Sequence, residues 1–167
     1  ILLFTVLLYF FSILNFAFSD VIKDVEIKNN KRITKQTIIT YGQIELNKDY
    51  DLNSINQVFK NLYETDFFET LKISIENNIL IIDVKENKII QNVNIEGLKT
   101  KKLTELILEN IYSRDKSPFL ITKVKEDIDK IKISLNQIGY YFAEVNTKTI
   151  ENSNDTIDLV FDINLGE

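Results

Sequence analysis

Val21-Ile22-Lys23-Asp24-Val25-Glu26-Ile27-Lys28 decides the fold, because a stretch with the same apolar spacing returns 68 positions later. The matching positions are Ile22, Val25 and Ile27 in the first stretch, and Ile90, Val93 and Ile95 in the second. Apolar and polar residues alternate, which predicts a strand over residues 21–28 with Val21, Val25 and Ile27 on one side. A repeated unit is more typical of a binding array than of an enclosed catalytic site.

Two helices and a hairpin are predicted after the first strand. Thr34 can cap a short helix that Gly42 ends, and Asp51 can cap a longer helix that Asp66 ends. The apolar stripe of the longer helix comprises Leu52, Ile55, Val58, Phe59 and Leu62. A strand over residues 71–75 and a strand over residues 79–86 then form a hairpin, with Asn77-Asn78 as its turn.

The second unit repeats this order. A strand over residues 90–96 stops at Gly97, and a first helix follows it. Thr122 can cap a second helix, which Gly139 ends. Its apolar stripe comprises Val124, Ile128, Ile131, Leu135 and Ile138. Strands over residues 145–149 and 156–163 complete the unit. The sequence therefore predicts an α+β fold of two tandem β-α-α-β-β units, each a three-stranded mixed sheet covered by two helices.

The first 19 residues carry no charged side chain and end in Ala17-Phe18-Ser19. This pattern predicts a signal peptide whose basic n-region is missing from the sequence, with cleavage between Ser19 and Asp20. The alternative is an uncleaved membrane anchor, since the apolar stretch approaches the length of a membrane span. The predicted organisation is a leader over residues 1–19, one unit over 20–88 and a second over 89–167.

Composition argues against most catalytic chemistries. The chain has no Cys and no His, which excludes disulfides, a thiol nucleophile and an imidazole base. Its net charge of −5 is spread over both units, without the basic stripe that nucleic-acid binding requires. Its glycines all lie at the ends of predicted elements, and none belongs to a phosphate-binding loop. We therefore expect no enzyme activity, no metal, no cofactor and no nucleic-acid partner.

Two aromatic corners connect the second helix of each unit to the hairpin, Asp66-Phe67-Phe68-Glu69 and Gly139-Tyr140-Tyr141-Phe142. We interpret both corners as parts of the core, where bulky rings fill the space left as the chain reverses. Phe67 and Phe68 cannot both face inward on one strand, so the outward ring is a candidate contact residue.

The chain resembles POTRA domains, the periplasmic repeats that precede the barrel of BamA-type outer-membrane assembly proteins. The resemblance rests on residues 61–69, on residues 138–145, on the ending over 158–163 with Gly166-Glu167, and on Arg32. Asn29 and Asp66 replace glycines of the family pattern, and both residue types tolerate a left-handed backbone. Leu165 replaces an acidic residue.

The resemblance implies a region that receives unfolded outer-membrane proteins and docks periplasmic chaperones and assembly-complex lipoproteins. It places the protein in the outer membrane, through a barrel outside this sequence, with this region in the periplasm. The alternatives are a two-partner-secretion or TamA-like transporter, and an anchored cell-division protein like FtsQ. FtsQ has one such unit, so two repeats argue against it.

Edge strands are the predicted binding sites, because their unpaired N–H and C=O groups recruit extended peptides by β-augmentation. The resemblance places the open edge at the strand that follows the helices. The predicted peptide-binding residues are Leu71, Lys72, Ile73, Ser74 and Ile75 in the first unit, and Val145, Asn146, Thr147, Lys148 and Thr149 in the second.

Overall fold

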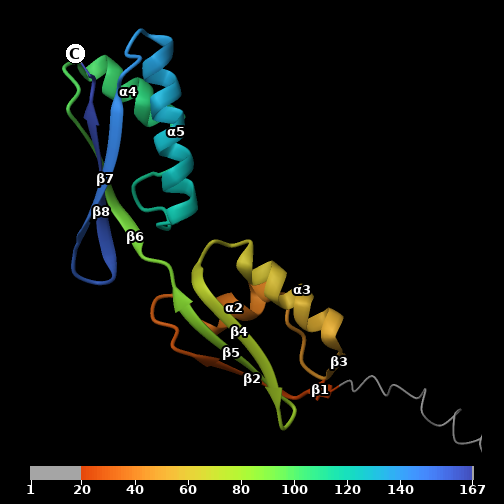
Figure 1. Cartoon of the computed structure of the whole chain (residues 1–167). Coiled ribbons are helices and arrows are strands. Elements are labelled where there is room, and N and C mark those ends of the chain that lie inside the picture. The colour runs from red at the N-terminus through yellow and green to blue at the C-terminus, as the bar shows by residue number, and fades with distance from the viewer. Residues whose placement is uncertain (1–19, 167) are drawn as a thin grey trace, which may run out of the picture. The chain divides into compact units, whose positions relative to one another are not determined.

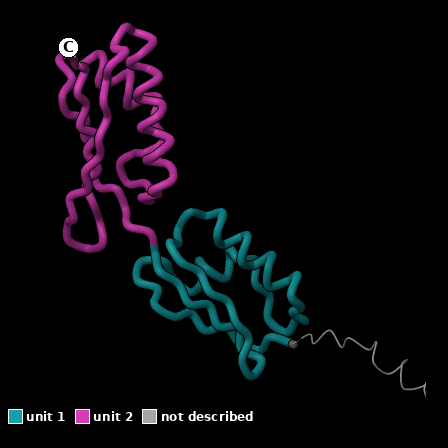
Figure 2. Tube along the Cα trace, viewed as in Figure 1, with its two compact units in different colours: residues 1–86 teal, residues 87–167 magenta. Residues whose placement is uncertain are grey.

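The structure is a computed structural model, and it describes residues 20–166. The chain divides into two compact units, the first ending at Glu86 and the second beginning at Asn87 (Figure 2). Each unit has its own hydrophobic core. The predicted signal peptide lies outside the described residues.

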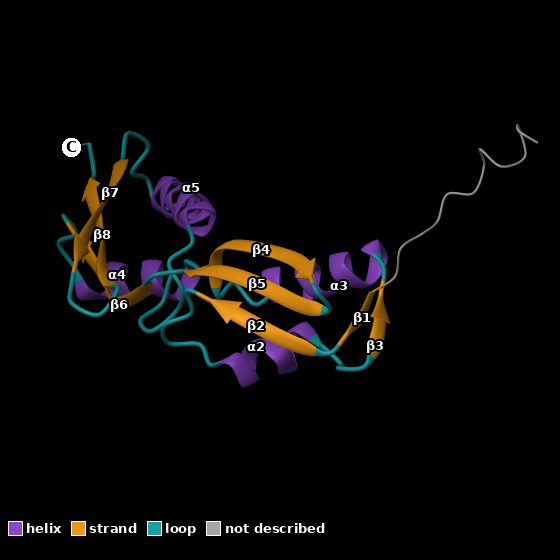
Figure 3. Cartoon of the chain, turned by 90° about the horizontal axis from the view of Figure 1, so that it is seen from below, coloured by secondary structure: helices purple, strands orange, loops and turns teal. Residues whose placement is uncertain are grey.

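Unit 1, residues 20–86, is a three-stranded sheet covered by two helices (Figures 1 and 3). In chain order its elements are β1 (Asp20–Ile22), β2 (Asp24–Lys28), α2 (Lys35–Gly42), β3 (Lys48–Tyr50), α3 (Leu52–Tyr63), β4 (Phe68–Glu76) and β5 (Ile79–Glu86). Strand β5 lies in the centre, parallel to β2 on one side and antiparallel to β4 on the other. The predicted mixed sheet is confirmed.

The single strand predicted over residues 21–28 is wrong, because the strand is broken at Lys23. Strand β1 leaves the main sheet and pairs with β3 in a separate two-stranded sheet, in which Ile22 lies opposite Lys48. The Lys23 amide donates to the Asn78 carbonyl oxygen at 2.8 Å, which fixes the break. As a result Ile22 is buried and Val21 is 40% exposed, the reverse of the predicted facing of Val21.

The helix ends of unit 1 follow the sequence in part. The Asp51 carboxylate accepts a hydrogen bond from the Ser54 amide at 2.8 Å and caps α3, as predicted. The end of α2 is one residue later than predicted, since Gln43 adopts the left-handed backbone and Gly42 stays in the last turn. A Cβ atom on Gly42 would lie only 3.1 Å from the Ile44 side chain, so close packing explains this glycine.

The predicted stripe on α3 is correct at Ile55, Val58 and Leu62, which pack in the core, and wrong at Leu52 and Phe59. Leu52 and Phe59 are 72% and 39% exposed. Leu52 is the first residue of the helix and lies on a flank that nothing in unit 1 covers. The buried stripe packs on Leu80, Ile82 and Val84 of the central strand.

Unit 2, residues 87–166, repeats the architecture without the small second sheet. Its elements are β6 (Ile89–Glu96), α4 (Lys101–Asn110), α5 (Ile121–Gln137), β7 (Glu144–Glu151) and β8 (Thr156–Asn164). Strand β8 lies in the centre, parallel to β6 and antiparallel to β7. Both helices lie on the face of the sheet that buries Leu159, Phe161 and Ile163 (Figure 1).

Two predictions for α5 are wrong. The N-cap residue is Leu120, without a side-chain cap, and Thr122 lies inside the first turn. The segment before α5 is held by backbone bonds, including one from the Phe119 amide to the Lys88 carbonyl oxygen at 2.8 Å, and this lets the helix begin earlier. At the other end α5 stops at Gln137, so Ile138 of the predicted stripe is 49% exposed.

Candidate peptide-binding edges

Each three-stranded sheet has two edges, and the predicted binding strands β4 and β7 each form one of them. Which backbone groups face outward follows from the hairpin register. Asn77 and Asn78 both have positive φ, 51° and 63°, as a two-residue type I′ turn requires. In such a hairpin the flanking pair, Glu76 and Ile79, exchanges both of its backbone hydrogen bonds, and bonded pairs then alternate along the ladder.

The alternation divides the predicted residues of β4 into two classes. Lys72 lies opposite Asp83, and Ser74 lies opposite Ile81, so their N–H and C=O groups bond to β5. Leu71, Ile73 and Ile75 occupy the other positions, so their N–H and C=O groups point out of the sheet. Among the described residues, no partner reaches these three amides.

Strand β7 has the same alternation. The Asn152 amide donates to the Thr156 carbonyl oxygen at 2.9 Å, which makes this pair a hydrogen-bonded one. Counting back along the register, Asn146 and Lys148 bond to β8. The backbone groups of Val145, Thr147 and Thr149 therefore point outward, and no partner within residues 20–166 reaches their amides.

The edge of β6, in contrast, is largely covered by the segment that leads into α5. The Ile90 amide donates to the Ser117 carbonyl oxygen at 2.9 Å, and the Lys116 amide donates to the Ile90 carbonyl oxygen at 2.7 Å. Further along the strand, the Val93 amide donates to the Asp115 carboxylate at 2.8 Å. An incoming peptide would have to displace these bonds.

The edge of β2 is short and carries a side-chain cap. Its Val25 amide donates to the Asp24 carboxylate at 2.7 Å, and Lys35 lies 3.4 Å from the same oxygen. The bond from the Val25 amide, helped by Lys35, lowers the pKa of Asp24, so this cap stays ionised at neutral pH. Of the edges in the two three-stranded sheets, only those of β4 and β7 are long and free of such covers.

On the face of each sheet that lies away from the helices, the two open strands carry polar side chains. Lys72 and Ser74 are exposed on the face away from the helices. Lys148 on β7 forms an ion pair with Asp162 of the neighbouring strand at 2.8 Å, and its hydrogen bond to that carboxylate raises the pKa of the Lys148 amine. None of these groups covers the outward backbone.

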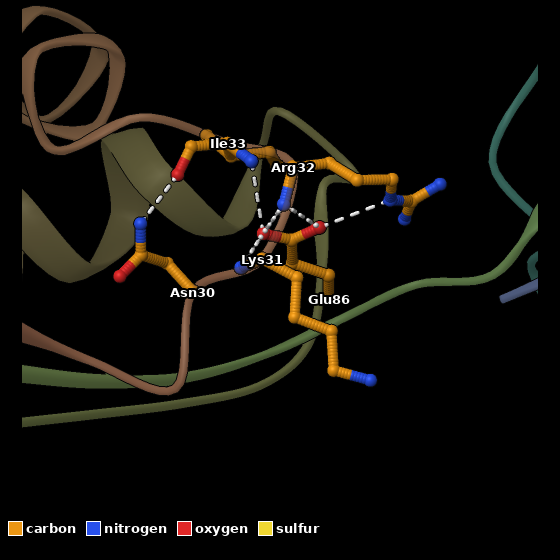
Figure 4. Close-up of polar contacts among 5 residues, drawn as sticks. All are labelled: Asn30, Lys31, Arg32, Ile33 and Glu86. Atoms are coloured by element: carbon orange, nitrogen blue, oxygen red, sulfur yellow. Dashed lines mark hydrogen bonds and ion pairs between the residues drawn. The ribbon is translucent and has the colours of Figure 1, made fainter. Parts of the chain in front are cut away.

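A buried carboxylate fixes the end of the central strand of unit 1 (Figure 4). Glu86 accepts hydrogen bonds from the amides of Lys31, Arg32 and Ile33 at 2.8 to 3.2 Å, and its second oxygen lies 3.1 Å from Arg32 Nε. Burial opposes ionisation, but these donors outweigh it and lower the pKa of Glu86. We single out Arg32 from the sequence, but not its partner Glu86. The signal that could have identified Glu86 is an acidic residue at the end of a predicted strand, in the same unit as Arg32.

The aromatic corners differ from the expectation. In unit 1 Phe68 is buried, and Phe67 is half-buried with its ring 5.4 Å from that of Tyr41, so the core interpretation is correct there. In unit 2 only Tyr140 packs on the core, and Tyr141 and Phe142 are 69% and 80% exposed. The core interpretation is wrong for these two, because they lie in a turn before β7 begins.

Residues 20–166 contain no group of carboxylates arranged to hold a metal ion. Within the same range no helix is long and apolar enough to cross a membrane. Every buried side-chain nitrogen or oxygen of the described residues has a hydrogen-bond partner.

Known proteins share this fold. Residues 88–166 match the family model described as "POTRA: Surface antigen variable number repeat". The chain is 26% identical over 135 residues to the outer membrane protein assembly factor BamA of Neorickettsia risticii, a match that spans 81% of this chain and 17% of that protein. The N-terminal domain of Omp85 from Thermosynechococcus elongatus has a TM-score of 0.56 at 13% identity, over 86% of this chain and 62% of the other.

A second solved structure, POTRA1-2 of the periplasmic domain of Omp85 from Anabaena, covers both units. Its TM-score is 0.51 at 13% identity, over 87% of this chain and 96% of the other. Unit 2 therefore matches the POTRA family model, and both units share the fold of the Omp85 POTRA domains. The chain as a whole is similar to part of BamA, an outer membrane protein assembly factor, and spans less than a fifth of that protein's length.

Proposed function

We propose that this region receives unfolded outer-membrane proteins in the periplasm, and that it does so by strand addition at the outward backbone of β4 and β7. The observation that carries the proposal is the pair of long edges whose alternate amides have no partner within residues 20–166. Of the other two edges, that of β6 is covered by a loop, and that of β2 is short and capped at Val25. The BamA relative is a protein that assembles outer membrane proteins, which supports this class of client.

Backbone recognition suits clients of many sequences, because it needs no particular side chain. Each outward residue offers one N–H and one C=O, and each bond contributes about 0.5–1.5 kcal/mol. Ordering an extended client opposes this by roughly 1–2 kcal/mol per residue. The two terms nearly cancel, so one edge binds weakly. Two edges on one chain hold a client better than either alone, because the second contact is intramolecular.

Chaperones and assembly lipoproteins are the proposed docking partners of this region. They would bind at the same edges or at the surfaces around them. The whole protein is proposed to reside in the outer membrane, with both POTRA domains in the periplasm. The similarity to BamA supports this location.

Proline substitution at an outward residue tests the binding mode, because proline removes the amide without touching the bonds to the central strand. Thr149 is the best position, since its side chain is exposed. Thr149→Pro should abolish peptide-induced amide shifts along β7, and Thr149→Ala should keep them. Both variants should retain the native NMR spectrum elsewhere. Equal binding by the two folded variants would overturn strand addition at this edge.

The same comparison at β4 uses Ile73→Pro and Ile73→Ala, which lose the same packing and differ in the outward amide. Substitutions at Lys72 or Ser74 are unsuitable, because proline there would remove a bond to β5. Loss of peptide binding in both Ile73 variants would assign binding to the side chain instead of the backbone.

A further inference from the structure

The second helix of each unit presents one flank to the open edge of its sheet. In unit 1, α3 packs against β4 and against α2. The Asn61 side-chain amide donates to the Gly42 carbonyl oxygen at 3.3 Å, so the flank that carries Asn61 faces α2. The two helices lie side by side on one face of the sheet, and α3 is the one that packs against β4. The flank of α3 that faces away from α2 therefore lies above the edge of β4.

Three apolar residues lie on this edge flank of α3. Leu52, Phe59 and Tyr63 follow a helical spacing and are 72%, 39% and 62% exposed. The rings of Phe59 and Tyr63 stack, with their centroids 5.9 Å apart and an interplanar angle of 11°. The flank carries no acidic or basic side chain. Below it, the strand presents the half-buried side chains of Leu71, Ile73 and Ile75.

The corresponding flank of α5 is basic. Lys130 Nζ lies 3.1 Å from the Asn110 carbonyl oxygen and 3.3 Å from the centroid of the Tyr112 ring, so the flank that carries Lys130 faces α4 and its loop. The opposite flank overlooks β7, against which α5 packs. Lys125 and Lys132 lie there at a seven-residue spacing, and both are exposed.

Neither Lys125 nor Lys132 forms an ion pair within the described residues. Asp129 lies beside them, four residues after Lys125 and three before Lys132, but no ion pair joins it to either lysine within residues 20–166. At the N-terminal end of the same flank, Ile121 is 57% exposed. Below the lysines, the strand presents Val145, Thr147 and Thr149, of which Thr149 is exposed.

We propose that the two open edges select different strands. The β4 edge takes an extended segment with uncharged apolar side chains at every second position, and the β7 edge takes one with acidic side chains at those positions. This inference rests on the proposed strand addition. A strand that pairs with β4 or β7 places alternate side chains on the helix side of the sheet, between the edge and the flank.

Charge decides the preference. A carboxylate beside Phe59 and Tyr63 would lose water without gaining a partner, which disfavours acidic segments at β4. The same carboxylate beside Lys125 or Lys132 meets a cation with no other acid bound to it. The β4 edge therefore fits strands with the apolar alternation of a membrane-facing strand, and the β7 edge fits acidic, water-facing ones.

Two synthetic peptides of equal length test the inference on the whole chain labelled with ¹⁵N. The first alternates Val or Tyr with Ser or Thr, and the second has Glu in place of the Val and Tyr residues. The first peptide should shift the amides of Leu71, Ile73 and Ile75 at lower concentration than those of β7, and the second should do the reverse. High salt should remove the preference of the acidic peptide.

Substitutions on the flanks of α3 and α5 test which side chains produce the preference of each edge for one peptide. Lys132→Glu should weaken the acidic peptide at β7 by roughly two- to fivefold, the range expected for exposed charge pairs. Lys102→Glu, which changes the net charge equally on α4, should leave that binding unchanged. Tyr63→Ser should weaken the apolar peptide at β4, and Tyr141→Ser, which removes an exposed tyrosine away from both flanks, should not.

The outcomes separate the two proposals. If both peptides rank the two edges in the same order, or if Lys132→Glu and Lys102→Glu act alike, edge selectivity is overturned and strand addition stands. If neither peptide shifts or protects an amide of either edge, strand addition itself is overturned, and the selectivity falls with it.

Discussion

The aromatic corners of the two units have similar sequences, but their rings differ in burial. Both begin with a residue of positive φ, Asp66 at 58° and Gly139 at 100°. In unit 1 the strand begins two residues later, and Phe68 enters the core as its first residue. In unit 2 the strand begins only at Glu144, so Phe142 stays in a turn and is 80% exposed.

The difference teaches that the start of the edge strand decides which ring is buried. An aromatic residue inside a strand is assigned to one face by the alternation of side chains. A residue in the turn before the strand is under no such constraint. The match between the two sequence motifs therefore predicts the corner, but not the burial of each residue in it.

Truncating the corners should give the largest contrast between the units. Phe68→Ala removes a buried ring and should destabilise unit 1 by about 3–5 kcal/mol. Phe142→Ala removes an exposed ring and should change the stability of unit 2 by less than about 0.5 kcal/mol. Urea unfolding followed by NMR signals from each unit measures both. Equal losses would show that the corner of unit 2 is packed as in unit 1.

Truncating a helix should show how independent the cores are. Leu62→Ala removes a fully buried side chain of α3 and should cost unit 1 about 2–5 kcal/mol. Hydrogen exchange should then rise over residues 20–86 and remain nearly unchanged over 87–166, because the two cores are separate clusters. Leu135→Ala in α5 is the matched change in unit 2. A rise throughout the chain with either variant would indicate one cooperative core.

Glu86 should make unit 1 sensitive to acid. Glu86→Gln keeps the shape but weakens the bonds from Lys31, Arg32 and Ile33, and should cost about 1–3 kcal/mol at neutral pH. Because the folded state lowers the pKa of Glu86, its stabilisation is present above the pKa of the unfolded chain and is lost as the pH falls below about 4.

The stability difference between the native protein and Glu86→Gln should therefore shrink between neutral pH and pH 3. Urea midpoints for unit 1, measured at several pH values, follow this directly. A difference that is constant over the whole range would mean that the ionised carboxylate contributes nothing beyond its shape.

The sequence alone predicted the order of the main elements in both units, because helix spacing, strand alternation and turn residues are local signals. The Asn77-Asn78 turn, the Asp51 cap and the positive φ of Asn29 and Asp66 are such cases, and all are confirmed. Strand β3 was missed, since its residues carry no alternation and it forms only because β1 lies beside it.

The site was predictable in part for the same reason. Residues 71–75 and 145–149 were identified as strands from alternation, but the outward half of each set depends on the register of the hairpin, which the sequence does not state. The cap on β2 depends on the conformation of the Asp24 side chain, and the cover on β6 comes from residues far away in the sequence. Asp115 reaches Val93 across a loop, and no local pattern announces that contact.

Hydrogen exchange of alternate amides in β4, with and without a client-like peptide, tests strand addition most directly. In the free protein the amides of Lys72 and Ser74 should exchange slowly, and those of Leu71, Ile73 and Ile75 quickly, because only the first two bond to β5. Strand addition predicts that the peptide slows the three outward amides and leaves the other two unchanged, with the same alternation along β7. Protection without alternation, or protection confined to Tyr141 and Phe142, would contradict it.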